Sequence, residues 1–569
     1  MAQADGSDGP TATTDCTQVS EIPQGECEDL MAFYSATNGD DWTHNDYWTK
    51  TNTPCSWYGV TCSSGHVTKI ILDNNNLGGN LIDLPHLSAL NDLWVRNNHI
   101  GGVIPDFTNL PNLWHFLASG NQLDGSIPDL HLGALLKLEL SNNQLDGTLP
   151  DFAHMPALRE LFLQSNQFDG AIPDFSHMPD LINLFLDHNQ LSGSIPDFAH
   201  IPDLSQLILS ANQLTGSVPD FSHMPSLTTL ELNYNQLNGS VPDFSHIPDV
   251  TQLYLNGNHL TGSIPDFSNL PNLSYLYLDH NQLSGSIPNF AHLPDLRSLY
   301  LHANQLEGEI PGFENSPLLL TLWLQDNQLR GVVSTGPTDG ICDLPVNDVN
   351  LGYNKLDIYA TDACVDSLDS DWKDTQTAPP VITHMVTLSS KSIRLEWDPI
   401  PYTGDGGYYD VRWGETYGGP YDHSVHTADK TANQMTINGL TPGHTYYFII
   451  RTFTPAHGEQ QNDLTSDDSN LASVMLVAIS TNGADVKLYW TPRTHVEDYQ
   501  VLYSQDFYFQ PDDAGVTQVA ATPPWYHYGA AADVAHNYAY LVRGDLGGGD
   551  YYGPFNRVGE FTFGLTPGN

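Results

Sequence analysis

Imidazole side chains recur along the middle of the chain at a nearly constant spacing. The positions are His154, His177, His200, His223, His246 and His292. Imidazole nitrogens are common ligands of transition metals, so a strip of this kind could bind ions. Equivalent positions of stacked turns lie roughly 5 Å apart, however, whereas one metal ion needs several ligands at about 2 Å. We therefore expect structural hydrogen bonding from this column rather than metal binding.

Carboxylates form a second column, in which each aspartate follows a proline. The positions are Asp106, Asp129, Asp151, Asp174, Asp197, Asp220, Asp243 and Asp266, and Asn289 and Gly312 interrupt the pattern. Clustered carboxylates suit calcium, which prefers oxygen ligands, but no acidic loop with calcium-binding spacing is present. Aspartate oxygens can instead accept hydrogen bonds from turn amides. We expect such local bonds, with a calcium strip as the alternative, and we assign no metal and no cofactor to the chain.

Aromatic side chains form the third column, at positions predicted to point out of short strands. They are Trp94, Phe162, Phe185, Tyr254, Tyr277, Tyr300 and Trp323, with Leu117, Glu139, Ile208 and Glu231 completing the column. Solvent-facing strand positions are usually polar, so exposed rings at one column are unusual. The rings could stiffen the sheet by cross-strand contact, or they could form a ligand platform. In the second case the acidic neighbours Asp279 and Asp326 would favour a cationic or hydroxyl-rich ligand.

These columns exist because the chain repeats itself between Leu72 and Leu356. The repeated phrase is Leu-x-x-Leu-x-Leu-x-x-Asn-x-Leu followed by Gly-x-Ile-Pro, with its Asn at 75, 98, 121, 143, 166, 189, 212, 235, 258, 281, 304, 327 and 354. The period is 23 residues except for one of 22 and a last one of 27. Each Leu-x-Leu predicts one short strand with its leucines inward. Neighbouring strands are expected to pair in parallel, with the Asn amides forming a ladder.

A fixed period with this pattern is the leucine-rich repeat signature. The Leu-x-Gly-x-Ile-Pro ending resembles the plant-type leucine-rich repeats of receptor ectodomains and polygalacturonase inhibitors. The resemblance implies a solenoid, here of about 13 repeats of 23 residues. With the two β-sandwiches that we expect after it, the predicted fold is mainly β. It implies little about the ligand, because such scaffolds carry many functions.

The segment before the repeats resembles the N-terminal cap of plant-type repeats and their bacterial relatives. Leu30-Met31-Ala32-Phe33-Tyr34 predicts a short helix, and Trp42, Trp48 and Trp57 are interpreted as cap core rather than as a ligand patch. The resemblance implies the pairs Cys16–Cys27 and Cys55–Cys62. Cys342 and Cys364 flank the last, irregular repeat and are expected to form a third disulfide. Three disulfides would indicate an oxidising compartment.

The C-terminal third is read as two β-domains. Gly439-Leu440-Thr441-Pro442-Gly443 and the segment 444–451 resemble the turn and strand of fibronectin type III domains, with Tyr446 as the tyrosine-corner residue. The second domain repeats this plan more loosely. It contains Arg543-Gly544-Asp545, which could indicate integrin binding, but Arg543 fits the strand pattern and three-residue matches often arise by chance.

The predicted domain limits follow from these segments. They are 1–15, a mobile N-terminal segment; 16–65, the cap; 66–357, the solenoid; 358–376, a C-terminal cap and linker; 377–475, a fibronectin type III-like domain; and 476–569, a second one. The start of the chain shows no signal peptide and reads as a mature terminus.

Charge and motifs narrow the function. A balance of 18 Lys+Arg against 67 Asp+Glu gives a net charge of −49, which makes nucleic acid and anionic membranes poor partners. No apolar run is long enough for membrane insertion, and no common catalytic motif is present, so we do not expect an enzyme. We expect a secreted or cell-surface recognition or adhesion protein that binds a protein or glycan on the concave solenoid face. The alternative is self-association, as a structural subunit of an extracellular filament or matrix.

Overall fold

The computed structural model describes the chain in two compact units. The described residues are 14–333, 341–359, 363–389, 391–476, 478–482, 485–489, 498–504, 517–521, 525–527 and 539–545. The first unit comprises Met1–Asn327, Val333–Asn350 and Asp362–Asp369, and the second comprises Gln328–Val332, Leu351–Thr361 and Ser370–Asn569. Each unit is described by itself.

The N-terminal cap packs its tryptophans into a small core. Helix α1 (Gln24–Ala36) is longer than the sequence predicted, and an antiparallel pair, β1 (Val60–Ser63) and β2 (His66–Ile71), follows it. Short 3-10 turns occur at Cys16–Gln18, Gly39–Asp41 and Pro54–Ser56. Trp42, Trp48 and Trp57 are at most 5 % exposed, and each indole N–H donates to an oxygen of the cap itself. The interpretation of these rings as cap core is therefore confirmed.

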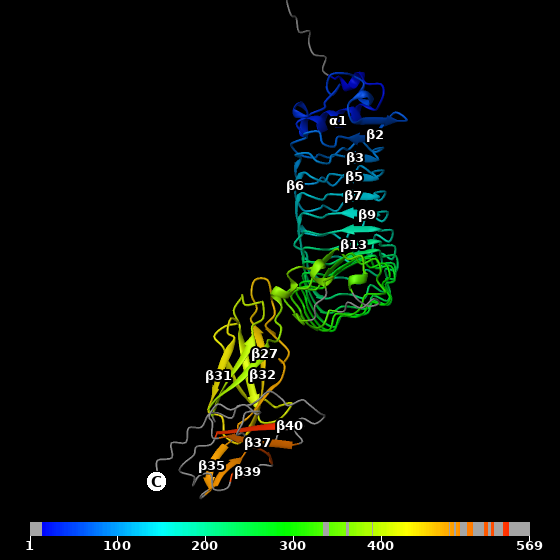
Figure 1. The fold of residues 1–569 in the computed structure, drawn as a ribbon. Helices are drawn as coiled ribbons and strands as arrows, with labels where there is room; N and C mark the ends of the chain where they lie inside the picture. The colour runs from blue at the N-terminus through cyan, green and yellow to red at the C-terminus, as the bar shows by residue number, and fades with distance from the viewer. Residues whose placement is uncertain are drawn as a thin grey trace, which may run out of the picture. The chain divides into compact units, whose positions relative to one another are not determined.

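The main sheet of the solenoid continues from β2 through every repeat, one strand per turn (Figure 1). Its further strands are β3 (Asp92–Trp94), β5 (His115–Leu117), β7 (Lys137–Glu139), β9 (Glu160–Phe162), β11 (Asn183–Phe185), β13 (Gln206–Ile208), β15 (Thr229–Glu231), β17 (Gln252–Tyr254), β19 (Tyr275–Tyr277), β21 (Ser298–Tyr300), β23 (Thr321–Trp323) and β25 (Asp348–Asn350). They pair in parallel without register shift, so equivalent residues of successive repeats stand side by side. In each main-sheet strand from β9 to β23 the central residue is a leucine with no exposed surface. It is buried because alternate strand residues face the core.

A second set of short strands lines the opposite side of the solenoid. One parallel sheet contains β4 (Gly101–Gly102), β6 (Gln122–Gly125), β8 (Gln144–Thr148) and β10 (Gln167–Asp169). The next contains, in this order, β12 (Ser192–Ser194), β14 (Gln213–Ser217), β16 (Gln236–Ser240), β18 (His259–Gly262), β20 (Gln282–Gly285) and β22 (Gln305–Gly308). In Figure 1, β6 lies on the side of the solenoid opposite β5 and β7.

A phenylalanine in the left-handed region of backbone space follows the Pro-Asp or Pro-Asn pair in eight of the repeats, whereas Leu130 follows Pro128-Asp129. Phe107, Phe152, Phe175, Phe198, Phe221, Phe244, Phe267 and Phe290 have φ between 47° and 52°. For a residue with a Cβ this conformation costs about 1–2 kcal/mol. The rings are at most 2 % exposed, and burial of such a side chain contributes about 1.5–3 kcal/mol, which offsets the strain. Nothing in the repeat pattern predicted this turn.

The second unit contains an antiparallel β-sandwich. One sheet is β27 (Val381–Ser389), β28 (Ser392–Asp398) and β31 (Gln434–Asn438); the other is β29 (Tyr408–Gly414), β30 (His423–His426), β32 (Thr445–Thr454), β33 (Leu464–Thr465) and β34 (Ala472–Met475). Trp397, Tyr409 and Phe448 are buried between the sheets. The Tyr446 hydroxyl accepts the Thr441 N–H at 3.0 Å, so the predicted tyrosine corner is confirmed.

Further elements precede and follow this sandwich in the sequence. They are β24 (Gln328–Gly331), a 3-10 turn at Ile341–Asp343, β26 (Lys355–Leu356), α2 (Val365–Leu368), a 3-10 turn at Trp372–Thr375, β35 (Ala478–Asn482), β36 (Asp485–Tyr489), β37 (Asp498–Ser504), β38 (Thr517–Ala521), β39 (Trp525–His527) and β40 (Ala539–Asp545). The last six form two three-stranded antiparallel sheets. Arg543-Gly544-Asp545 lies in β40, where Arg543 pairs with Gln500, as its strand pattern predicted.

Candidate ligand-binding site

Four aromatic rings form a continuous strip over β17, β19, β21 and β23. The strip consists of Tyr254, Tyr277, Tyr300 and Trp323, which are paired residue for residue by the parallel register. Consecutive ring centroids are 4.7, 4.3 and 4.9 Å apart, with interplanar angles of 58–59°. These distances follow the strand spacing of about 4.8 Å. The Trp323 indole N–H also donates to Asp348 Oδ1 at 3.0 Å, which fixes the last ring of the strip.

The four rings are half-buried, so both interpretations of the column find support in the geometry. Each ring packs against the next, which stiffens the sheet. Each also keeps an exposed part, which a ligand could contact. Burial, together with the charge of neighbouring groups, raises the pKa of Tyr254 and Tyr277 to about 12. Both hydroxyls are therefore neutral hydrogen-bonding groups at physiological pH.

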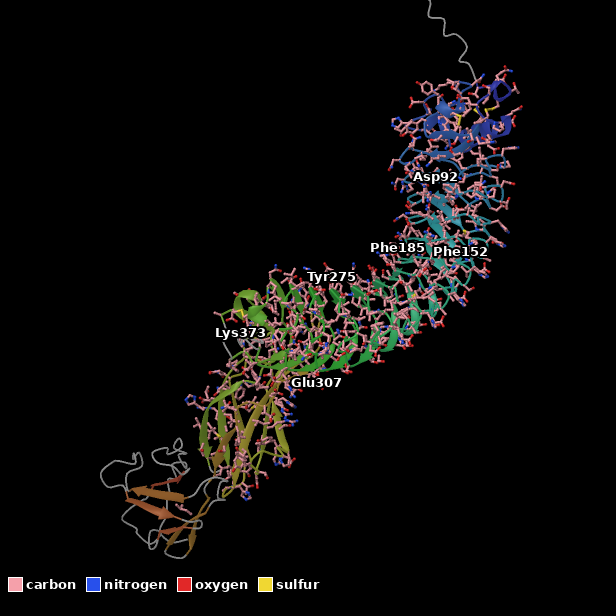
Figure 2. The ribbon with its side chains drawn as sticks, turned by 90° about the vertical axis from the view of Figure 1, so that its right-hand side faces the viewer. Asp92, Phe152, Phe185, Tyr275, Glu307 and Lys373 are labelled. Atoms are coloured by element: carbon pink, nitrogen blue, oxygen red, sulfur yellow. A yellow bond between two sulfur atoms is a disulfide. The ribbon has the colours of Figure 1, made fainter. Side chains whose placement is uncertain are left out.

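The other predicted ring positions are separate from this strip. Phe162 and Phe185 contact each other at 4.7 Å between centroids, and Trp94 lies further toward the cap. Ile208 and Glu231 lie between Phe185 and Tyr254 in the column. Leu117, which is buried, and Glu139, which is half-buried, lie between Trp94 and Phe162. The seven predicted residues thus form one strip of four, one pair and one single ring. Figure 2 shows Phe185 on the inner side of the solenoid curve and Phe152 closer to the outer side.

Tyr275 adds a ring that the sequence analysis did not include. It lies two residues before Tyr277 in β19, on the same face of the strand, and it is half-buried. Figure 2 shows Tyr275 on the inner side of the curve. Its signal in the sequence was the alternation Tyr275-Leu276-Tyr277, since residues i and i+2 of a strand face the same side. Tyr275 therefore widens the aromatic surface to two rings at β19, beside the strip.

Charged side chains dominate the same face near the cap. Asp92, which is 3 % exposed, accepts from Lys69 Nζ at 2.8 Å and contacts His115 Nδ1 at 2.5 Å. Burial alone would raise the pKa of Asp92, but the hydrogen bonds from Lys69 and His115 outweigh it and lower that pKa. Further along, Lys137 Nζ lies 3.0 Å from Glu160 and 4.6 Å from the Phe162 ring centroid. Lys69 and Lys137 are thus already paired with carboxylates of the protein.

The acidic side chains beside the strip are largely covered. Asp279 and Asp326, which the sequence placed there, are each 6 % exposed, so they act on a ligand through their field more than by contact. Glu231, at the near end of the strip, is half-buried; burial and then the charge of Asp187 raise the pKa of Glu231. Asp348 at the far end is exposed. Both ends of the strip therefore carry carboxylates.

The aspartate column makes the local turn bonds that were expected. In seven of its eight positions Oδ1 accepts the backbone N–H two residues later, at 3.0–3.2 Å. Asn289 makes the same bond to Ala291 at 3.2 Å. At the eighth position Asp129 Oδ1 instead lies 2.9 Å from His154 Nδ1. These bonds give the column a structural role without requiring a metal.

The histidine column is exposed at all six positions. His154 bonds to Asp129 and stacks on His131 at 4.0 Å between ring centroids, and His246 Nδ1 lies 3.5 Å from the Ser245 hydroxyl. Among the described residues, two groups of three have ligand atoms within 4.8 Å of one another: Asp129, His131 and His154, and Asp279, His280 and His302. Of the histidines in these two groups, only His154 belongs to the column. The spacing of the column therefore gave no indication of the second group.

The three predicted disulfides are all formed. Cys16–Cys27, Cys55–Cys62 and Cys342–Cys364 join residues 11, 7 and 22 positions apart. Two lie in the cap and one lies near the end of the repeats. Within the described parts of the chain, no helix is long and apolar enough to cross a membrane.

Comparison with protein families identifies the parts of the chain. Residues 25–63 match the leucine rich repeat N-terminal domain, 248–292 and 271–315 match Leucine Rich repeats (2 copies), and 378–466 match the fibronectin type III domain. A curated relative, von Willebrand factor A domain-containing protein 1 of Danio rerio, is 28% identical over 146 residues, which is 21% of this chain and 28% of the relative.

Among solved structures, the leucine-rich repeat ectodomain of the Arabidopsis receptor kinase HAESA, in complex with an N-terminally extended IDA peptide hormone, is similar to this chain. The match is 31% identical with a TM-score of 0.50 and covers 58% of each chain. A TDR receptor structure is 26% identical with a TM-score of 0.44, covering 53% of this chain and 57% of the other. The chain thus spans a little over half the length of these structures. It carries a leucine-rich repeat solenoid with its N-terminal cap and a fibronectin type III domain.

Proposed function

We propose that this chain is an extracellular binding protein whose solenoid holds a protein ligand along the strip of Tyr254, Tyr277, Tyr300 and Trp323. The observation that carries the proposal is the strip itself: four consecutive half-exposed rings in register on one face of the sheet. Aromatic side chains often dominate binding energy, because they bury a large area with few rotatable bonds.

The surroundings of the strip favour a ligand segment with basic side chains. Carboxylates lie at both ends of the strip, at Glu231 and Asp348, and the whole chain has a net charge of −49. Such a field attracts cations and disfavours anionic partners. The Tyr254 hydroxyl donates to Gln252 Oε1 at 3.2 Å, so its oxygen could accept from a backbone N–H of an extended polypeptide. Sugar rings would also stack on such a strip, and the test below separates the two ligand classes.

The similar ectodomain of HAESA was solved with a peptide hormone, and a peptide or protein ligand on a repeat scaffold is therefore a reasonable expectation for this chain. The three disulfides support an extracellular setting, because they persist in oxidising compartments. Leucine-rich repeat and fibronectin type III domains are typically binding domains rather than catalytic ones, and we propose no enzymatic activity.

The test uses the full chain on a displayed library of random peptides and, separately, on a glycan array. We expect enrichment of peptides rich in Lys, Arg and aromatic residues. Trp323→Ala and Tyr277→Ala should each weaken binding of the selected peptides by about 2 kcal/mol. Trp114→Ala is the matched control, because Trp114 is 47% exposed on the solenoid but is not part of the strip.

Three outcomes would contradict the proposal. Peptide binding that Trp323→Ala leaves unchanged would place the site elsewhere on the solenoid. Binding restricted to the glycan array would reassign the strip to sugars. Assembly of the pure chain into filaments, seen by size-exclusion chromatography and electron microscopy and prevented by the same variants, would make the strip a contact between copies of the chain.

A further inference from the structure

Three potential metal ligands converge where two neighbouring strands end. Asp279 and His280 lie two and three residues after the end of β19, and His302 lies two residues after the end of β21. Because Tyr277 pairs with Tyr300, Asp279 and His302 occupy the same position of successive repeats. Asp279 Oδ2 lies 2.9 Å from His280 Nδ1 and 3.6 Å from His302 Nε2. All three ligand atoms lie within 4.8 Å of one another.

These distances match the spacing of ligands around a tetrahedral ion. Zinc bonds of about 2.0–2.1 Å in tetrahedral geometry place ligand atoms roughly 3.3 Å apart. The two measured distances, 2.9 and 3.6 Å, lie on either side of that value. The 3.6 Å separation is also too long for a direct hydrogen bond. Small side-chain movements would therefore complete the geometry, without a change in the backbone.

Burial makes the group a partly built site. The side chains of Asp279 and His302 are 8% and 12% exposed, whereas that of His280 is 60% exposed, so the group is closed on the protein side and open to solvent on the other. The Nδ1 atom of His302 is buried and has no hydrogen-bond partner, although buried polar atoms are normally paired. His302 therefore makes its polar contact through Nε2, which faces Asp279.

We propose that Asp279, His280 and His302 bind one divalent transition-metal ion of the Zn²⁺ type, with a fourth coordination position left for water or another donor. Two imidazoles and one carboxylate are suitable ligands for zinc. Calcium and magnesium prefer oxygen ligands in larger number, so this site should discriminate against them. The site lies beside the aromatic strip, since the His302 ring centroid is 5.4 Å from that of Trp323.

The chain contains its own control for this site. Asp187 and His188 occupy the same two positions four repeats earlier, and their Oδ2 and Nδ1 atoms are also 2.9 Å apart. The residue of the following repeat that corresponds to His302 is Ser210. The Asp–His pair is thus present twice, whereas the third ligand is present only beside Asp279. A site that depends on all three ligands should exist only there.

The experiment is a calorimetric titration of the full chain, first treated with chelator and then dialysed, with ZnCl₂ at neutral pH. We expect a saturable site of one ion per chain and a rise in melting temperature with Zn²⁺ but not with Ca²⁺ or Mg²⁺, since an ion stabilises the state that it binds. His302→Ala should weaken this site by more than about 100-fold, beyond the 10–100-fold effect of losing an outer-shell partner. His188→Ala should leave it unchanged.

Two further variants keep the result interpretable. His280→Ala removes a largely exposed ligand, so its loss of zinc affinity cannot be attributed to misfolding. His154→Ala tests the exposed group at Asp129, His131 and His154. The proposal is overturned if the chain binds no Zn²⁺, if zinc binding survives both His280→Ala and His302→Ala, or if His154→Ala or His188→Ala abolishes it instead.

Discussion

The side-chain oxygen of Asn212 accepts the backbone N–H of Leu191, 21 residues earlier, at 3.0 Å. The amide nitrogen of Asn212 donates to the carbonyl of Leu186 in the same earlier repeat and to that of Leu209 in its own. One side chain therefore satisfies buried backbone groups of two turns at once. The same set of bonds recurs at Asn235, Asn258 and Asn281, which explains why the position is constant.

Replacement of Asn212 by alanine should destabilise the solenoid by about 3 kcal/mol. The change leaves the buried N–H of Leu191 without a partner, which costs about 1–3 kcal/mol. It also removes one of the two amide donors from the carbonyls of Leu186 and Leu209, which keep Asn189 and Asn235. Urea unfolding monitored by circular dichroism would measure the loss. Gln213→Ala, at the exposed neighbouring position, should change the midpoint little. A similar shift for both variants would show that the ladder bonds contribute no more than the surface does.

Replacement of Asp266 by alanine should cost about 1 kcal/mol, because the turn N–H of Ser268 loses its acceptor. Asp266→Asn should be nearly neutral, since Asn289 makes the same bond one repeat later. The hydrogen bond from Ser268 lowers the pKa of Asp266 below its ordinary value of 3.8. The stability that the Asp266 carboxylate contributes through this bond should therefore be complete above pH 3.8. It should decrease as the pH falls below that value.

An acid titration of the melting temperature compares the wild type with Asp266→Asn. Below pH 3.8 the wild type should lose stability faster than Asp266→Asn, because an amide does not take up a proton in this range. Parallel curves for the wild type and this variant would show that the carboxylate bond is not coupled to folding.

Alkaline pH should weaken the solenoid before the tyrosines of the folded strip ionise. Burial first, and then neighbouring charge, raises the pKa of Tyr254 and Tyr277 from 10.0 to about 12. Between these values the unfolded chain loses protons that the folded chain retains, so the free energy of unfolding falls as pH rises. Tyr277→Phe should show a shallower fall between pH 10 and 12 in pH-dependent urea unfolding. An unchanged slope would mean that the hydroxyl of Tyr277 is as solvated as in the unfolded chain.

Lys430 in the second unit should have the opposite pH dependence. It has no exposed surface, and its Nζ lies 3.2 Å from the Thr454 hydroxyl and 3.8 Å from the Tyr402 ring centroid. Burial lowers the pKa of Lys430 to about 8, although the charge of Asp405 acts in the other direction. From pH 8 to 10.5 the unfolded chain holds a proton that the folded chain has released, so folding becomes more favourable as pH rises.

The gain across that interval should be at most about 3 kcal/mol. Lys430→Met keeps the length of the side chain without the charge, so it should be more stable than wild type at pH 7 and should lack the rise. Differential scanning calorimetry of the unfolding transition assigned to this unit would measure both. If the wild type shows no rise between pH 8 and 10, Lys430 stays charged in the folded protein.

The sequence by itself determined the solenoid, its cap and the fibronectin type III domain. A repeat that places Leu184, Leu207 and Leu230 at one period leaves a single arrangement in which all are buried, namely parallel strands in register. Once the register is known, the column of rings follows, and the resemblance to plant-type caps implied the two cysteine pairs of the cap. Local pattern and translational symmetry therefore carry this part of the prediction.

Tertiary structure alone decided how the side chains of those columns are used. No periodicity indicates that Phe198 adopts a left-handed backbone, because that strain is offset only by the ring's burial within the solenoid. The rings near Tyr277 pack on one another, and His302 turns its Nε2 toward Asp279, through contacts that depend on rotamer and burial. Such contacts vary between repeats of the same backbone, as Ser210 and His302 illustrate, because a repeat fixes the position of a side chain but not its partners.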